Sequence, residues 1–491
     1  MLTDLGFLSI GQMWPPPSEV DRLKLYDRNR KLFENKHDEV YAEQFKRIQR
    51  VIGNFQNVIS YAVLANFQKL ISLKVADLLL GDPPKILVGK EDSQEQEVID
   101  TICSNSDFNN TAYQAVIDIS RMGDGLFFIY KDADTSAGKI DVTQPSIWFP
   151  VVSPDNIKKV QYHVLAWTFD VIESNDGVLN RIMNGKVQKS KHLKVQIHSI
   201  SSYEVREYLL KDGQIVAMLG EPTTIKTGLN DFAIIQVSNT ITSDRVFGID
   251  DYGDIDSIVS ELEVRVSQIA KVLDKHAEPS VSGPSSALRQ DPQTGEYHLK
   301  MGNFFARDNN EDPETKYITW DASLEANFKY IEKLVNLLYT ISEMGSAIFG
   351  DMEGHRTGQI PSGSALRRLM ISPLAKVRRI RMRLDPALKK AIKLCSQLGG
   401  EGIQDLSKAS ISIQWNDGLP QDPLEEAQIM QVRTGDKPTI SQVTAIERLD
   451  GLNEEDAQIE LDLIRSDEAS TNPLGGNNFP YANSNANNGG E

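Results

Sequence analysis

The sequence has little of what would indicate a secreted, membrane or metal-dependent protein. Only two cysteines, Cys103 and Cys395, occur among 491 residues, too few for a disulfide framework or a thiolate zinc site. No apolar run approaches the roughly 20 residues that cross a bilayer, and the first residues lack the basic region of a signal peptide. We therefore expect a protein of a reducing compartment, made in the cytoplasm, with no membrane partner.

Motifs of catalytic sites are also missing. None of the Gly-Lys pairs at 89–90, 138–139 and 185–186 has the earlier glycine of a phosphate-binding loop, and neither His-Glu-x-x-His nor Gly-x-Ser-x-Gly occurs. His192 and His198 share one face of a predicted strand, and we interpret them as surface histidines. With 69 Asp and Glu, many carboxylate pairs occur by chance, so paired carboxylates neither indicate nor exclude acid–base chemistry. We expect no enzyme activity, no catalytic residue, no metal and no cofactor.

Positive charge is scarce as well. There are 52 Lys and Arg against 69 Asp and Glu, which gives a formal net charge of -17. Because affinity for DNA comes largely from cationic contacts with phosphates, this excess of acid argues against tight wrapping of DNA. Any nucleic acid must be handled loosely or by a few local groups.

The order of patterns predicts an α+β protein that is mainly helical. Residues 18–80 have helical periodicity, which Gly81 and the Pro83-Pro84 pair should stop. Residues 98–130 predict a helix that runs into an apolar strand, and 139–247 predict short strands separated by turns.

Two long amphipathic helices are predicted at 251–276 and 323–349, on either side of an insert at 277–322 rich in Gly, Pro and Asp. Each carries carboxylates along one face, repeated at the same offsets. One interpretation is a pair of solvated faces, with Lys329 pairing to Glu325 and Glu332. The other is an acidic lining. The carboxylates are Asp256, Glu263 and Asp274 on the first helix and Glu325, Glu332 and Glu343 on the second.

A glycine-rich loop at 350–362 precedes a third predicted helix at 363–398, which reverses the charge. This helix carries ten basic residues against the single acid Asp385, and Pro373 and Pro386 should kink or interrupt it. Its arginines are Arg367, Arg368, Arg378, Arg379, Arg381 and Arg383.

This order of helix, insert, helix, glycine loop, SGSALRR and basic helix resembles the portal proteins of tailed bacteriophages, particularly siphophages of Gram-positive hosts. The segments LISLKVADLLLGDPPKI, WFPVVSPDNIKKV, SIQWNDGLPQDPLEEAQI and TISQVTAIERLDGLNEEDAQIELDLI are similar to that family too, so about residues 40–466 are covered. The resemblance implies a ring, usually of twelve subunits, at one capsid vertex of the virion. Double-stranded DNA passes through it during packaging and ejection.

The resemblance also assigns the parts of the chain. It implies an α/β wing at 1–250 and 363–410, stem helices at 251–276 and 323–349, and an α/β clip at 277–322. A tunnel loop at 350–362 and a helical crown at 411–466 follow, and the composition of 467–491 predicts a disordered tail. The implied partners are the subunit itself, DNA, the large terminase and the head completion adaptor at the clip, and the major capsid and scaffolding proteins.

The acidic stripes suit a channel lining, because carboxylates repel phosphates and leave DNA free to slide. We favour Asp256, Glu263 and Asp274 for this role. His355, Arg356 and Gln359 of the tunnel loop are candidates for transient phosphate contacts, or the loop packs on a neighbouring subunit. The basic helix contacts acidic segments of adjacent subunits or DNA itself. The alternatives to a portal are another capsid assembly component and an acidic α+β hydrolase.

Overall fold

The computed structural model divides the chain into two compact units. Unit 1 comprises Met1–Gly354 and Leu369–Gly418, and unit 2 comprises His355–Arg368 and Leu419–Glu491. The residues that the structure describes are 1–47, 62–89, 93–172, 189–277, 281–282, 288–290, 297–299, 316–317, 324–350, 367–400, 402–416, 423–435, 437–450 and 454–471.

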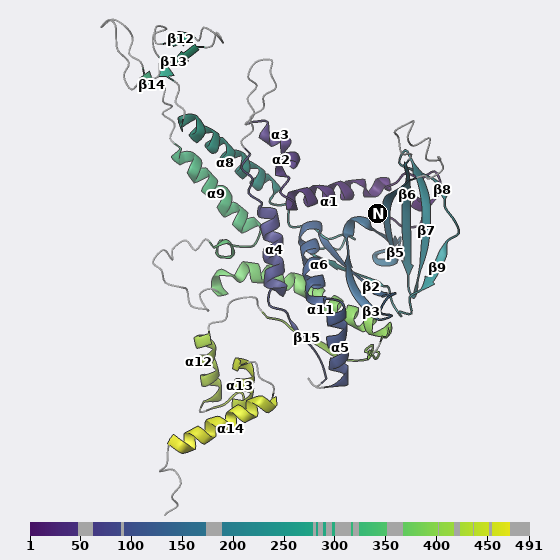
Figure 1. The fold of residues 1–491 in the computed structure, drawn as a ribbon, viewed down its shortest axis with the longest axis vertical. Helices are drawn as coiled ribbons and strands as arrows, with labels where there is room; N and C mark the ends of the chain where they lie inside the picture. The colour runs from purple at the N-terminus through teal and green to yellow at the C-terminus, as the bar shows by residue number, and fades with distance from the viewer. Residues whose placement is uncertain are drawn as a thin grey trace, which may run out of the picture. The chain divides into compact units, whose positions relative to one another are not determined.

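A six-stranded antiparallel sheet dominates one end of unit 1 (Figure 1). Its strands lie in the order β4, β5, β6, β7, β8, and β9 also pairs with β7. Side chains of a strand alternate between faces, so the sheet presents two apolar surfaces. The strands are β4 (Trp148–Ser153), β5 (Asn156–Ile172), β6 (Lys189–Ser199), β7 (Ser202–Lys211), β8 (Gln214–Met218) and β9 (Thr223–Lys226).

One face of this sheet packs against a second, three-stranded sheet in the order β10, β2, β3. Trp148 and Leu165 of the large sheet form a buried cluster with Leu126 and Ile234 of the small one. The apolar runs that predicted strands thus become the inner layer of the unit. The strands are β2 (Asp124–Lys131), β3 (Gly138–Thr143) and β10 (Ile234–Ser238).

The first residues of the chain cover the other face of the large sheet. Leu2, Leu8 and Trp14 are buried in one cluster with side chains of β4 to β8. Isolated bridges join Leu2 to Val151 and Met13 to Gln214. The segment that lacks a signal peptide's basic region is therefore part of the core.

Helices fill the rest of unit 1. Asn66 caps α4 by accepting a hydrogen bond from the backbone of Lys69, and α4 ends at Leu80, which confirms the predicted stop. The predicted helix at 98–130 is instead two helices before β2. The helices and short 3₁₀ turns are η1 (Gly6–Leu8), η2 (Pro17–Glu19), α1 (Val20–Phe33), α2 (His37–Val40), α3 (Ala42–Phe45), α4 (Phe67–Leu80), α5 (Gln94–Asn105), α6 (Phe108–Met122) and η3 (Pro145–Ile147).

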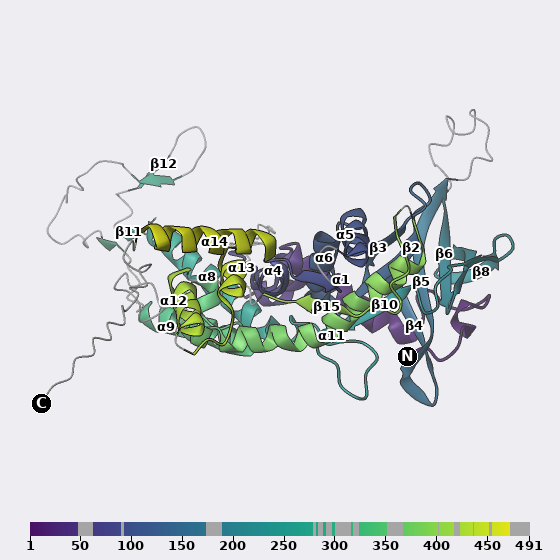
Figure 2. The same ribbon diagram turned by 90° about the horizontal axis from the view of Figure 1, so that it is seen from below.

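The long basic helix α11 (Ile371–Gln397) lies against the three-stranded sheet and against α4 and α5 (Figure 2). It lies so close to β3 that a Cβ at Gly138 would be 2.4 Å from the carbonyl oxygen of Cys395. The predicted helix 363–398 is not interrupted at Pro386, because α11 continues through it. A turn at Met370 separates residues 367–369 from α11, and Pro373 stands in the first turn of α11, where no backbone donor is required.

A short strand pair joins distant segments. β1 (Lys85–Val88) pairs antiparallel with β15 (Ile411–Gln414). Residues 411–414 therefore belong to unit 1, whereas the sequence placed them with the crown.

The two predicted stem helices are α8 (Asp256–Ala277) and α9 (Glu325–Ile341), and they pack side by side (Figure 1). Leu334 and Leu338 of α9 are buried in this contact. The second helix ends earlier than predicted and is followed by η5 (Ala347–Phe349). The insert contributes four short strands, β11 (Val281–Ser282), β12 (Leu288–Gln290), β13 (Tyr297–Leu299) and β14 (Lys316–Tyr317).

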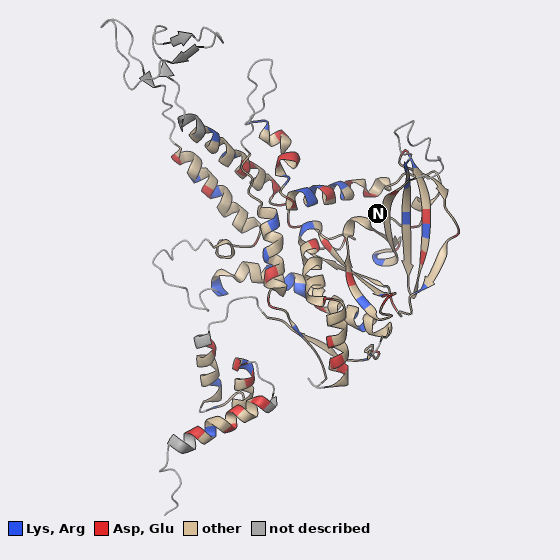
Figure 3. Ribbon diagram, viewed as in Figure 1, with Lys and Arg blue, Asp and Glu red and all other residues tan. Residues whose placement is uncertain are grey.

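The helices described in the C-terminal part of unit 2 are α12 (Pro423–Thr434), α13 (Gln442–Asp450) and α14 (Glu454–Thr471). Ala457 and Leu461 of α14 are buried, and acidic residues follow much of its length (Figure 3). The prediction of disorder is wrong for 467–471, which continue α14. The remainder of the predicted tail lies outside the described residues. Within the described part of the chain, no helix is long and apolar enough to cross a membrane.

Candidate functional site

The acidic stripe of α8 faces the N-terminal part of its own subunit. Asp256 forms an ion pair with Arg28 of α1 and accepts a hydrogen bond of 2.8 Å from the hydroxyl of Tyr41. Burial and the neighbouring Asp256 carboxylate raise the pKa of the Tyr41 hydroxyl, so Tyr41 stays a neutral donor. Asp256 is thus committed to contacts within the subunit.

Glu263, about two turns further along α8, is completely buried. Its Oε1 lies 2.7 Å from Nδ1 of His37 and accepts a hydrogen bond of 2.9 Å from the backbone of Ala65. Nε2 of His37 donates to the carbonyl of Leu32 at 3.0 Å. The prediction that Glu263 lines a channel is wrong, because a carboxylate enclosed by its own subunit cannot face an open passage.

Helix α8 makes two further contacts with N-terminal residues. The backbone N–H of Val63 donates to Oγ of Ser267 at 2.9 Å, and Arg47 donates to Glu261 at 2.9 Å. We call residues 28–47 and 62–65, which supply these contacts with α8, the N-terminal clasp. Asp256 and Glu263, which helical periodicity placed on a different face from the apolar residues, thus contact the clasp.

The carboxylates of α9 are more exposed. Glu325 pairs with Lys329 at 2.7 Å, which confirms the predicted helical pairing for that carboxylate, and Glu332 is exposed. Glu343 forms an ion pair with Arg379 of α11. The side chain of Asp274 lies outside the described residues. Acidic and basic residues alternate along the α8–α9 pair (Figure 3), so its described surface is mixed in charge rather than uniformly acidic.

The buried side chain of Lys376 joins α11 to the start of α8 and to the end of α9. Lys376 Nζ lies 2.9 Å from Asp251, just before α8, and donates at 3.0 Å to the carbonyl of Ser342, just after α9. Asp251 also accepts hydrogen bonds from Ser120 at 2.6 Å and Asn239 at 2.8 Å. Sequence reasoning counted Lys376 only as part of the basic charge. Its position beside the apolar repeat of the helix was the signal that it would be buried.

Several of the predicted contact arginines hold their own subunit together. Arg381 donates to the carbonyl of Asn416 at 3.0 Å and lies over the Trp415 ring, and Arg383 donates to the carbonyl of Asn239. The side chains of Arg367, Arg368 and Arg378 are exposed. The exposed arginines therefore remain the candidates for contacts beyond the subunit.

The tunnel-loop candidates His355, Arg356 and Gln359 lie outside the described residues. Most of the predicted clip, 277–322, does so too.

The strand histidines differ from the prediction. His198 is completely buried beside His163, its partner across β5 and β6. Burial lowers the pKa of His163 to about 3 and that of His198 to about 4, so both are neutral. Trp148 donates to Nδ1 of His163 at 3.1 Å. His192 pairs with Glu207 at 2.7 Å, so neither predicted surface histidine is a free group.

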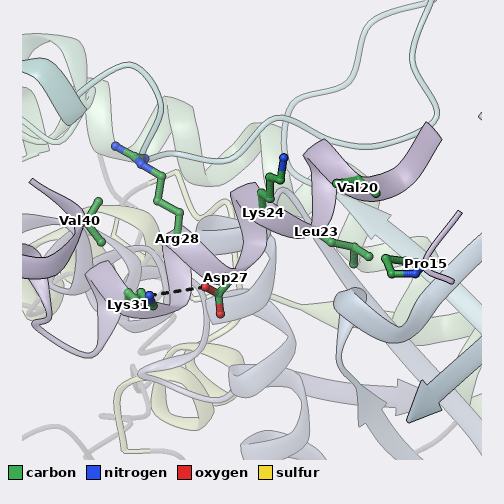
Figure 4. A pocket seen from close by; sticks show the side chains of 8 residues that line it. All are labelled: Pro15, Val20, Leu23, Lys24, Asp27, Arg28, Lys31 and Val40. Carbon is green, nitrogen blue, oxygen red and sulfur yellow. Dashed lines mark ion pairs between the residues drawn. The ribbon is translucent and has the colours of Figure 1, made fainter. Parts of the chain in front are cut away.

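A groove of about 480 Å³ follows α1 (Figure 4). Lys24, Arg28 and Lys31 line it together with Asp27. Arg28 pairs with Asp256, and Lys31 lies 3.8 Å from Asp27, so most of the positive charge is already compensated. No group of three His, Cys, Asp or Glu that could hold a metal occurs among the residues described.

A sequence model of the family described as "Phage portal protein, SPP1 Gp6-like" matches residues 19–473. The chain belongs to this family of phage portal proteins. A portal is a connector component of the virion, structural rather than enzymatic. The α+β fold of this portal protein agrees with the resemblance seen in its sequence.

Solved structures similar to this portal protein include two particle necks. A chain of the "Neck of empty GTA particle computed with C6 symmetry" is 13% identical, with a TM-score of 0.45, and the match covers 79% of this chain and 90% of that one. A chain of the "Neck of native GTA particle computed with C12 symmetry" is 11% identical, with a TM-score of 0.41 and coverage of 78% and 89%. Among curated proteins, none matches.

Proposed function

We propose that this portal protein forms a closed ring at one vertex of a phage capsid and that double-stranded DNA passes through the ring during packaging and ejection. Copies assemble in the host cytoplasm and then enter the virion. Family membership supports the connector role, and the net charge of -17 suits a passage that must not hold its cargo.

The observation that carries the ring is the apolar surface that the α8–α9 pair leaves uncovered. A lone helix pair in water would bury such side chains, and exposed apolar patches mark interaction sites. Neighbouring copies on either side would cover them. The exposed apolar residues are Leu273, Phe328, Tyr330, Leu337 and Ile341.

The passage does not depend on the α8 stripe, because Asp256 and Glu263 are committed to the N-terminal clasp. The tunnel loop, with His355, Arg356 and Gln359, supplies a few donors that touch DNA without trapping it. Arg368 and Arg378, exposed beside it in the sequence, are the other candidates for such contacts.

The insert at 277–322 is the proposed docking site of the large terminase and, after packaging, of the head completion adaptor. The remaining outer surface of unit 1 meets the major capsid and scaffolding proteins. ATP hydrolysis then belongs to the terminase, in agreement with the missing phosphate-binding loop.

Light scattering after size exclusion, followed by end-view electron microscopy, tests the ring. We expect closed rings with a central hole, whereas a chain that stays monomeric or dimeric at all concentrations would contradict the proposal. Deleting residues 285–315 tests the docking site. Rings should persist and terminase binding should be lost, and retained binding would reject this assignment.

A further inference from the structure

One side of the α8–α9 pair carries a basic groove. The groove has a volume of about 230 Å³ and lies where the two helices meet. Ile269 and Val272 line it with apolar surface, and Arg47, Arg265 and Lys271 line it with positive charge. It offers room for an apolar side chain next to an anion.

The two arginines of the groove have one acidic partner between them. Arg47 donates to Glu261 at 2.9 Å, and Arg265 donates to the same carboxylate at 2.7 Å. Two guanidinium groups thus share one carboxylate. The guanidinium carbon of Arg265 also lies 5.6 Å from the centre of the Tyr330 ring, which places the groove on the Tyr330 side of α9.

The opposite side of α9 carries an apolar knob beside an acid. Phe328 is 53% exposed, and Glu332, one turn later, is exposed without an ion pair among the described residues. At 100° per residue, the two positions lie about 40° apart around the helix, and each lies about 160° from Tyr330. The knob and the groove therefore face in nearly opposite directions.

We infer that Phe328 and Glu332 of one copy dock in the groove formed by Arg47 and Arg265 of the next copy. The phenyl ring of Phe328 fills the apolar part of the groove, and the carboxylate of Glu332 lies beside the guanidinium groups of Arg47 and Arg265. Because the two surfaces lie on opposite sides of one hairpin, each copy can use both at once. Such head-to-tail contacts generate a closed ring when the rotation closes. This inference rests on the proposed ring and assigns its contact.

The first test compares ring formation by full-length variants. Phe328→Ser and Glu332→Arg should each lower the fraction of protein in rings by roughly tenfold or more at fixed concentration, as loss of a central interface anchor does. Melting of the separate subunit should stay unchanged, since both side chains are exposed. Matched controls are Ile172→Ser, at a β5 position that is 54% exposed, and Glu221→Arg in an exposed loop. Both controls should assemble like the unaltered chain.

The second test mixes two impaired variants. Glu332→Arg repels the groove of its own kind, and Arg47→Glu repels the knob of its own kind. In an equimolar mixture, each altered surface meets an opposite charge, so rings should return with the two variants alternating. Folded variants that are each impaired and still fail to assemble together would overturn the pairing.

The outcomes also separate this inference from the proposed function. Phe328→Ser and Glu332→Arg proteins that form rings as the unaltered chain does would overturn the contact and leave the ring in place. An unaltered chain that forms no closed ring would overturn the proposed function and this contact with it.

Discussion

Nδ1 of His37 lies 2.7 Å from Oε1 of Glu263, with both side chains completely buried. The imidazole comes from the short helix α2 and the carboxylate from the middle of α8. The contact therefore fixes the N-terminal clasp to a stem helix. Helical periodicity predicts that the carboxylate of Glu263 is exposed to solvent, but it binds α2 to α8 within one subunit.

Reversing the charge at Glu263 should unfold the clasp. Glu263→Lys places an ammonium beside His37 and the Ala65 N–H donor, so we expect a loss of about 3 to 5 kcal/mol in the free energy of unfolding. Glu263→Gln should lose less, because its amide oxygen still accepts from Ala65. Urea unfolding followed by circular dichroism measures both.

Glu325→Lys is the matched control for that experiment. The carboxylate of Glu325 is 74% exposed and pairs only with Lys329 at the helix surface, so its reversal should change stability by less than about 1 kcal/mol. Equal losses at the two positions would contradict the burial of Glu263.

Removing the ammonium of Lys376 should loosen the junction between α11 and the stem helices. Lys376→Met leaves the buried carboxylate of Asp251 without its cation, and we expect a loss of about 3 to 5 kcal/mol. Adding Asp251→Asn should restore part of it, since a neutral amide needs no counter-charge. A double variant no more stable than Lys376→Met would show that the pair is not coupled in this way. Thermal and urea unfolding of the four proteins complete the cycle.

Acid should lower the free energy of unfolding, because His163 and His198 are buried as neutral side chains. Burial holds the pKa of His163 near 3 and of His198 near 4, whereas an unfolded histidine has a pKa of about 6.5. Below that value the unfolded chain binds more protons. Stability is complete above pH 6.5 and falls toward pH 4 by about 1.4 kcal/mol per unit for each histidine.

The variant His198→Gln tests this dependence, because it removes one titrating ring. The slope of unfolding free energy against pH between 6 and 4.5 should decrease. The stabilities of the variant and the unaltered chain at pH 7.5 show how much the substitution changes packing alone. An unchanged slope would mean that His198 is not held neutral.

Thiol reagents should react slowly with the folded subunit. Burial raises the pKa of Cys103 and Cys395 to about 12, so little thiolate exists at pH 8. We expect labelling at least about 100-fold slower than in urea, since the thiolate is the reactive form. Fast labelling of the native protein, followed by absorbance, would contradict this burial.

The sequence indicated the helices and strands well where local signals were strong. Gly81 and the prolines after it stop α4, and apolar alternation located the strands of both sheets. The family resemblance also held, because it depended on the order of segments rather than on any contact.

Partners in space could not be predicted in the same way. The periodicity that placed Asp256 and Glu263 on one face of α8 is real, but Arg28, His37 and Ala65 contact these carboxylates, and no local pattern links the two segments. Likewise Pro386 removes one backbone donor, yet packing of α11 against the three-stranded sheet keeps the helix continuous. Tertiary contacts outweigh local preference at both places.

The pairing of β1 with β15 also sets an order of events during synthesis. Lys85 pairs with Gln414, so β1 is an unprotected strand edge until the ribosome has made residues 411–414. The face of β3 that packs on α11 likewise stays uncovered until α11 has been synthesised. Chains that end before β15 therefore leave the hydrogen-bonding edge of β1 without its partner strand.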